Sequence, residues 1–214
     1  MENYLDLRNT HDYTKLQKPA QIIKNGGIVI FPTETVYGIG TNALNEQSIK
    51  HLFEIKQRPL NKPISLLVNS MKMIEEIATD ISDIEYALMK NFFPGPLTII
   101  LKKNNIIPNI VTSNSNTVGI RMPANKIALE LLNYANIPIA TTSSNLSGNP
   151  SQTNFENTIK DFKNSADYFI NGGESEIGLA STVIQIVNNT PYILRQGSIS
   201  EAEIKSFIKS FIKE

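Results

Sequence analysis

Several polar side chains whose types suit ligand binding cluster where apolar segments end. In the stretch FPTETVYGIG, residues 31–40, Thr33, Thr35 and Tyr37 follow the apolar run 28–30. Two hydroxyl groups and a phenol at the end of a buried strand can hydrogen-bond the polar groups of a small ligand. A self-contained turn would use the same residue types, because threonine hydroxyls often bond their own backbone. The stretch by itself leaves both interpretations open.

A second cluster is basic. Lys56 and Arg58 come just before Pro59, at the end of an expected helix, and Lys62 comes just before Pro63. Such side chains can bind phosphate or carboxylate oxygens, arginine as a fork and lysine as a point charge. They can equally complement the dipole at a helix C-terminus, which is worth up to about 1 kcal/mol. We take Lys56 and Arg58 as exposed charges, so replacing either with alanine is expected to leave thermal unfolding close to wild type.

Two more clusters follow later strands. The stretch TTSSNLSG, residues 141–148, leaves an apolar run at 137–140 and offers hydroxyl, amide and loop N–H groups to a ligand. An Asx or ST turn explains the same residues equally well. The chain from Ser181 to Arg195 has the pattern of a β-hairpin that turns at residues 188–191. That hairpin would bring a hydroxyl group and a guanidinium to the same end.

Helix-like and strand-like segments alternate along the chain, which indicates an α/β fold. Polar clusters at strand ends fit the position at which open α/β sheets hold ligands. We expect one twisted, mixed, open sheet flanked by helices, in a single domain 1–214 with its core at about 14–200. The expected helices lie at 14–25, 45–57, 82–92 and 200–212, with a capping box from Ser82 to Glu85. The expected strands lie at 28–31, 64–68, 97–101, 118–121, 137–141, 168–170, 182–187 and 192–195.

Composition excludes several classes of function. The 214 residues carry 20 basic and 20 acidic side chains, so no net charge favours a polyanionic partner. The absence of cysteine excludes thiol nucleophiles, disulfides and zinc sites that use cysteine. The start MENYLDLRNT has no apolar signal core, and no apolar run is long enough for a membrane span, so we expect a cytoplasmic protein.

Common catalytic motifs are also missing. The sequence contains no P-loop, G-x-G-x-x-G, H-E-x-x-H or G-x-S-x-G motif. Its two histidines, His11 and His51, have no partner at metal-binding spacing, and a hydrolase built on Ser143 would lack an evident histidine base. A nucleotide, if bound, must therefore be held by an uncommon set of loops.

Seven sequence blocks occur in order along the chain: FPTETVYGIG, IKQRPLNKPISLLV, FFPGPLTIIL, VGIRMP, TTSSNLSGNPS, GLASTV and ILRQGSIS. Together they resemble the YrdC/TsaC family of threonylcarbamoyl-AMP synthases, from about residue 14 to residue 200. The resemblance implies a twisted α/β sheet (YrdC-like) with a positively charged concave face. It also implies an enzyme, a nucleotidyltransferase that combines L-threonine, bicarbonate and ATP into L-threonylcarbamoyladenylate and diphosphate. This is the first step of threonylcarbamoyladenosine formation in tRNA.

The family's site residues can be carried over by position. Its K-x-R and S-x-N elements, the catalytic candidates, fall on Lys56, Arg58, Ser143 and Asn145. Contacts to ATP would fall on Arg58, Lys62, Thr117, Ser143, Ser151 and Arg195. Contacts to L-threonine would fall on Thr35, Tyr37, Arg121, Thr141 and Ser181, with Tyr37 as a nearby wall.

The chemical properties of some of these residues agree with the roles that the resemblance implies. Two positions depart from the family pattern. Arg121 can take a carboxylate as a bidentate pair, and a site that bonds the threonine hydroxyl should reject valine. Leu67 stands where longer relatives often carry a histidine, and Thr141-Thr142 replaces the more usual Ala-Pro. The second change is harmless if Thr141 contributes only its backbone. No acid or base stands out, and Glu34 is assigned no role.

The resemblance also implies partners. Mg²⁺ would accompany ATP, with no metal ligand from protein side chains, and the adenylate would pass to a tRNA threonylcarbamoyltransferase complex. Direct tRNA binding is left open, and we expect the short, single-domain form of the family. The alternatives are a double-stranded RNA or tRNA-binding module without turnover, and a carbamoyl-transfer domain like that of hydrogenase maturation proteins.

Overall fold

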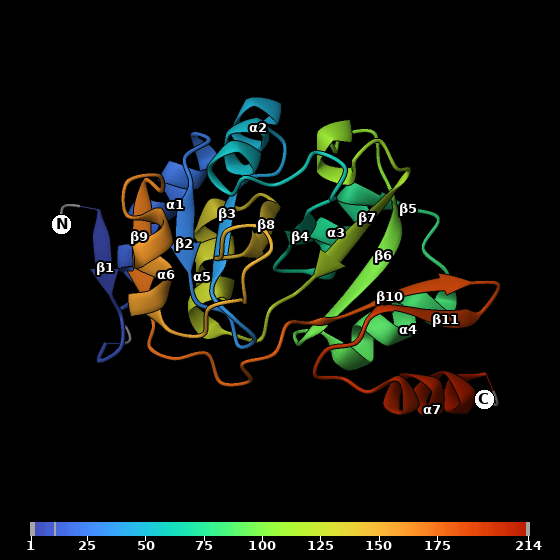
Figure 1. Ribbon diagram of the computed structural model, residues 1–214. Helices are drawn as coiled ribbons and strands as arrows, with labels where there is room; N and C mark the ends of the chain where they lie inside the picture. Colours follow the sequence, from blue (N-terminus) through green and yellow to red (C-terminus); the bar gives the residue numbers. More distant parts are fainter. Residues whose placement is uncertain (1–2, 11, 213–214) are drawn as a thin grey trace.

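Eleven strands form one mixed sheet in the computed structural model, which describes residues 3–10 and 12–212 (Figure 1). The strand order is β1-β9-β2-β3-β8-β4-β7-β6-β10-β11, and β5 pairs with β6. The twisted, mixed α/β sheet flanked by helices is therefore confirmed. The strands are β1 Tyr4–Asp6, β2 Val29–Phe31, β3 Gly38–Asn42, β4 Ser65–Leu67, β5 Ala78–Thr79, β6 Leu97–Lys103, β7 Thr117–Arg121, β8 Ile139–Ser143, β9 Tyr168–Asn171, β10 Thr182–Val187 and β11 Thr190–Arg195.

Most helices begin at a polar side chain that caps the first turn. Asn45, Ser82 and Ser200 each accept a hydrogen bond from a backbone N–H three residues on, and the capping box of Ser82 with Glu85 is confirmed. The helices are α1 Gln17–Lys24, α2 Glu46–Ile55, α3 Met71–Ile77, α4 Asp83–Phe92, α5 Lys126–Ala135, α6 Phe155–Phe162 and α7 Glu201–Phe211, with 3-10 helices at Tyr13–Leu16 and Asn109–Thr112.

The strand β3 was not predicted, because it lies in the glycine-bounded stretch taken as a loop. Glycine is depleted in strands, but here β3 pairs with both β2 and β8. A Cβ atom on Gly40 would lie 2.8 Å from the Ile139 side chain and 3.0 Å from the Ala140 carbonyl oxygen. Glycine therefore allows the close approach of two strands.

Other differences concern boundaries and short elements. The strand expected at 137–141 runs from Ile139 to Ser143, so the start of the third polar cluster is strand and not loop. The helix expected at 14–25 is divided into a 3-10 turn and α1. Sequence patterns also missed β1, β5, α3, α5 and α6.

Two clusters of buried apolar side chains stabilise this arrangement. Helices α1 and α5 pack on each other within the smaller cluster. Helices α4 and α7 pack in the larger one, where the Phe92 and Phe207 rings meet edge to face at 5.5 Å. Figure 1 shows α4 and α7 beside the hairpin of β10 and β11. None of the helices in the described part of the chain is long and apolar enough to cross a membrane.

Candidate functional site

A cavity of about 390 Å³ opens on one face of the central sheet. Its floor uses alternate residues of neighbouring strands, and alternate residues of a strand share one face. They are Ser65 and Leu67 of β4, Gly119 and Arg121 of β7, Thr98 and Ile100 of β6, and Thr141 and Ser143 of β8. Gly38 of β3, Thr142 of β8 and Val183 of β10 also line the cavity. Loops and the β10–β11 hairpin supply the walls, with Thr33, Thr35, Val36, Tyr37, Arg58, Ala180, Ser181, Leu194 and Arg195. All four polar clusters of the sequence thus contribute to one cavity.

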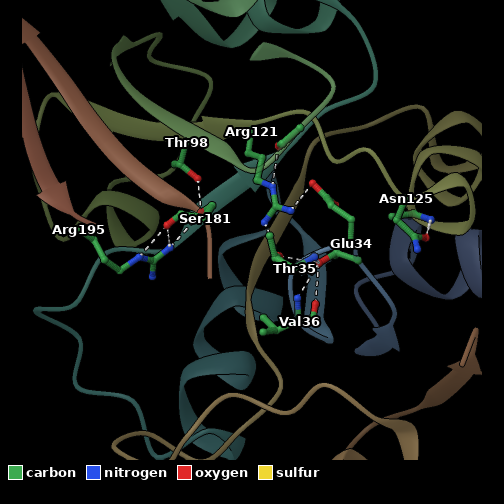
Figure 2. A network of polar contacts seen from close by, with 11 residues as sticks. Glu34, Thr35, Val36, Thr98, Arg121, Asn125, Ser181 and Arg195 are labelled. Atoms are coloured by element: carbon green, nitrogen blue, oxygen red, sulfur yellow. Dashed lines mark hydrogen bonds and ion pairs between the residues drawn. The ribbon is translucent and has the colours of Figure 1, made fainter. Parts of the chain in front are cut away.

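The Arg121 guanidinium is held from three directions in this cavity (Figure 2). Its Nη1 donates to Thr35 Oγ1 at 2.9 Å, and its Nε donates to the Gly95 carbonyl at 3.2 Å. Its Nη2 lies 2.7 Å from Glu34 Oε1, and both side chains of this ion pair are nearly buried. The pair lacks hydrogen-bond geometry despite the short distance, so the Glu34 carboxylate keeps its acceptor capacity within the described residues. Arg121 is therefore fixed and electrically paired before any ligand binds.

The hydrogen bonds of the hydroxyl groups beside Arg121 have a defined donor and acceptor. Thr33 Oγ1 donates to the Val36 carbonyl at 2.6 Å, so the 2.9 Å contact between Thr33 and Thr35 is donated by Thr35. Thr35 Oγ1 also accepts from Arg121. With its proton committed, Thr35 can only accept a further hydrogen bond, which suits a ligand ammonium or hydroxyl group.

The predicted β10–β11 hairpin is confirmed, and it brings Ser181 and Arg195 together. Its turn is shorter than the predicted 188–191, because Thr190 and Pro191 already pair in β11. Asn188 and Asn189 form the turn with φ values of 49° and 59°, as a type I′ hairpin requires. Arg195 Nη2 donates to Ser181 Oγ at 3.0 Å and to the Ser181 carbonyl at 2.9 Å. Thr98 Oγ1 lies 2.8 Å from the same Ser181 hydroxyl.

Gly197 allows this end of the hairpin to close. A Cβ atom there would lie 2.3 Å from the Ala180 carbonyl oxygen and 2.4 Å from the Thr182 nitrogen. We therefore expect Gly197→Ala to lower the free energy of unfolding by about 1–3 kcal/mol and to displace Ser181 from Arg195. Urea denaturation measures the change, with exposed Ser198→Ala as the matched control. Equal unfolding curves for the two variants would contradict this close contact.

Arg58 and Arg195 differ from Arg121 because neither forms an ion pair within residues 3–10 and 12–212. Arg58 donates from Nε to the Lys62 carbonyl at 3.0 Å and from Nη2 to the Pro63 carbonyl at 2.8 Å. Burial and then the Arg195 charge lower the pKa of Arg58, while burial and then the Arg121 charge lower the pKa of Arg195. The three guanidiniums therefore form one field, in which only Arg121 has a counter-charge.

The expectation that Lys56 is an exposed charge is wrong, since its residue is 1% exposed. Its Nζ donates to the Ser143 carbonyl at 2.6 Å and also to the Asn145 carbonyl. The Lys56 carbonyl in turn accepts from the Ser147 nitrogen at 3.1 Å. Lys56 thus anchors the loop after β8 to the end of α2, outside the residues that line the cavity. Its predicted catalytic role stays a prediction.

Burial, and then the Arg58 charge, lower the pKa of Lys56 from 10.5 to about 7. Between these two values the unfolded chain keeps the proton and the folded chain loses it, so the free energy of unfolding rises with pH. Because one lysine binds one proton, its contribution to this slope is at most about 1.4 kcal/mol per pH unit. The two carbonyl contacts favour the charged form and reduce it. We expect Lys56→Met to remove this slope, measured by urea denaturation from pH 7 to pH 10. Exposed Lys50→Met is the control, and parallel profiles for wild type and Lys56→Met would refute the effect.

Of two further predicted residues, Tyr37 lines the cavity, whereas Asn145, a catalytic candidate, lies outside the lining. The Tyr37 hydroxyl donates to the Gly173 carbonyl at 2.6 Å and accepts from the Gly172 nitrogen at 3.2 Å, and burial raises its pKa. Asn145 Nδ2 donates to the Leu146 and Asn149 carbonyls at 2.9 and 2.8 Å. Both side chains therefore shape loops around the cavity.

Some positions assigned from the family resemblance line the cavity, and others do not. Thr141 lines it, but its hydroxyl donates to the Ile139 carbonyl at 3.1 Å, and its backbone lies in the sheet between Gly40 of β3 and Ser65 of β4. Leu67 also lines it, as a buried apolar group. Among the described residues, three predicted ATP contacts lie outside the lining: Lys62, Thr117 and Ser151. Their role stays a prediction.

Sequence reasoning missed three residues that organise this site. They are Glu34, the ion-pair partner of Arg121, Thr98, the neighbour of Ser181, and Gly197, which lets the hairpin close. A carboxylate between Thr33 and Thr35 was a visible signal. Its partner, however, lies on a distant strand.

Known proteins are similar to this chain in sequence and fold. The family model described as Sua5_yciO_yrdC, Telomere recombination, matches residues 21–197. The chain is 40% identical over 204 residues to the threonylcarbamoyl-AMP synthase of Pyrococcus abyssi, covering 95% of this chain and 60% of that protein. It is 36% identical over 204 residues to the threonylcarbamoyl-AMP synthase of Bacillus subtilis, covering 95% of this chain and 59% of that protein.

A solved structure agrees with these relatives. The crystal structure of P. abyssi Sua5 complexed with L-threonine superposes with a TM-score of 0.93 at 40% identity, covering 96% of this chain and 60% of that one. The chain thus spans about 60% of the length of these relatives. The resemblance stated from the sequence blocks is confirmed. Because the family model covers most of the chain and the similarity extends to the whole sheet, this chain belongs to the Sua5/YciO/YrdC family.

Proposed function

We propose that this chain is an L-threonylcarbamoyladenylate synthase, a nucleotidyltransferase that joins L-threonine, bicarbonate and ATP. The relatives that share 36% and 40% of its sequence are named threonylcarbamoyl-AMP synthases. The structure of P. abyssi Sua5 holds L-threonine. These names support the activity, and the geometry of the cavity supports the assignment of its two ends.

The main support for this proposal is that the cavity holds three arginines, one with an ion-pair partner and two without one among the described residues. Arg121 is paired with Glu34 and lies beside accepting hydroxyl groups, which suits a zwitterionic amino acid whose carboxylate contacts Arg121. Arg58 and Arg195 have no counter-charge in the described chain, which suits the phosphates of ATP. One cavity therefore offers a place for L-threonine and a place for ATP.

The proposed reaction needs no covalent nucleophile from the protein. The threonine amine first attacks bicarbonate and gives a carbamate with loss of water. A carbamate oxygen then attacks the α-phosphorus of ATP in line, the bond to the β-phosphate breaks, and diphosphate leaves. The protein would position the reactants and stabilise the negative charge on the phosphates, through Arg58 and Arg195.

A metal ion and macromolecular partners belong to the same proposal. No group of three acidic, histidine or cysteine side chains within the described residues could hold a metal ion. In this proposal Mg²⁺ would be held by the ATP phosphates and water, where it would neutralise charge. The adenylate product would pass to a separate tRNA threonylcarbamoyltransferase complex.

Diphosphate release by the purified protein tests this function. With ATP, Mg²⁺ and bicarbonate, we expect release with L-threonine to exceed release with L-valine by at least about a hundred-fold, because valine leaves the hydroxyl contacts unpaired. Mass spectrometry should identify threonylcarbamoyl-AMP. Release that is absent, or indifferent to the amino acid, would refute the proposal, and salt-dependent tRNA titrations would then test the RNA-binding alternative.

A further inference from the structure

Glu34 is a buried carboxylate for which the reaction has no stated use. Its residue is 4% exposed, and it lies between Thr33 and Thr35, which both line the cavity. Glu34 itself stays outside the lining, and its carboxylate contacts Arg121 at 2.7 Å. In Figure 2 it lies on the side of Arg121 opposite to Ser181 and Arg195. The carboxylate thus backs the guanidinium and leaves its cavity side open.

The backbone of Glu34 is held by the fold. The Glu34 carbonyl accepts from the Ile177 nitrogen at 2.8 Å, which ties the segment to the loop after β9. Its neighbour Thr35 accepts from Arg121 on the other side. The Glu34 carboxylate is buried outside the cavity lining and lies against Arg121. It therefore acts on a ligand in the cavity through the Arg121 guanidinium.

The charge of this pair decides which ligand the Arg121 end can attract. A partly desolvated cleft with three uncompensated guanidiniums would draw anions along its whole length. Glu34 cancels one of the three charges and leaves Arg58 and Arg195 as the unpaired cations. The neutral ion pair costs a net-neutral zwitterion little electrostatic binding energy. It also offers a phosphate ion little electrostatic attraction.

We propose that Glu34 is a positioning residue that makes the Arg121 end of the cavity selective for a net-neutral amino acid and against phosphate. It does so by holding the Arg121 guanidinium and cancelling its charge. This inference rests on the proposed function for the identity of the amino acid as L-threonine. The exclusion of phosphate follows from the ion pair alone.

Competition between L-threonine and inorganic phosphate, followed by calorimetry, tests the inference. In the wild type, we expect phosphate to displace ATP but not L-threonine. In Glu34→Gln, phosphate should displace L-threonine, at a concentration at least about ten-fold below the highest one that leaves the wild-type complex with L-threonine intact, because one close charge in a desolvated site has been removed. Glu34→Asp keeps the charge and should still exclude phosphate. Glu46→Gln, which breaks an exposed ion pair with Lys50, is the matched control.

The outcomes separate this inference from the proposed function. Unchanged phosphate competition in Glu34→Gln relative to Glu46→Gln would overturn the inference while L-threonine binding still supported the function. If the wild type binds no L-threonine, the function fails, and the inference is then judged by whether Glu34→Gln binds one more phosphate ion than the wild type. If Glu34→Gln does not fold, the inference is tested on the wild type alone. Displacement of L-threonine from the wild type by phosphate would refute the proposed exclusion of phosphate.

Discussion

Arg58→Ala is expected to lower the rate of threonine-dependent diphosphate release by at least about a hundred-fold. Arg58 lines the cavity without an ion-pair partner in the described chain, so its guanidinium is available to the phosphates. Removing one donor that stabilises charge in a transition state typically costs about 10²–10³ in rate. Initial rates at saturating ATP and L-threonine measure the effect.

The fold should largely survive this change. Among the described residues, Arg58 donates to the Lys62 and Pro63 carbonyls alone, and each such bond contributes about 1 kcal/mol. Arg8→Ala is a matched control, because Arg8 is exposed and pairs with Asp6. A rate for Arg58→Ala within three-fold of Arg8→Ala would exclude Arg58 from the phosphate site.

Arg121→Ala is expected to raise the KM for L-threonine by about a hundred-fold and to change the KM for ATP far less. A charge-assisted pair with the substrate carboxylate contributes about 1.5–3 kcal/mol, which corresponds to this change. Initial rates measured against each substrate at saturating concentrations of the others give both values. An effect confined to ATP would mean that the two ends of the cavity are assigned in reverse.

The same variant should be less stable, because it leaves Glu34 buried without its partner. Breaking a buried ion pair on one side typically costs about 3–5 kcal/mol. Assays therefore belong well below the unfolding temperature of the variant. Arg121→Lys is the informative companion, since it keeps the charge but loses the fork, and we expect its KM for L-threonine to lie between those of wild type and Arg121→Ala.

Local sequence signals predicted what depends on near neighbours. The capping residues Asn45, Ser82 and Ser200 begin helices as expected, because each satisfies a backbone N–H three residues away. The turn at Asn188 and Asn189 follows from the tolerance of asparagine for positive φ. Strand β3 failed this kind of prediction, since its glycines act through contacts to another strand.

The sequence predicted several residues of the candidate site, but it did not predict what each of them contacts. The ordered blocks pointed to Arg58, Ser143, Ser181 and Arg195, and the structure places all four around one cavity. Lys56 belongs to the same blocks but is buried under the loop after β8. Nothing local distinguishes its charge from that of Arg58, because burial depends on which segment packs over the helix end.

The sequence alone therefore determined the family, the α/β sheet and the polar segments that meet at its face. The tertiary structure decided which charges are paired: Arg121 with Glu34, and Arg58 and Arg195 with no carboxylate among the described residues. It also decided that Lys56 supports a loop and lies outside the cavity lining. The physical reason is that helix caps and turns depend on adjacent residues, whereas burial and ion pairing depend on strands brought together from distant parts of the chain.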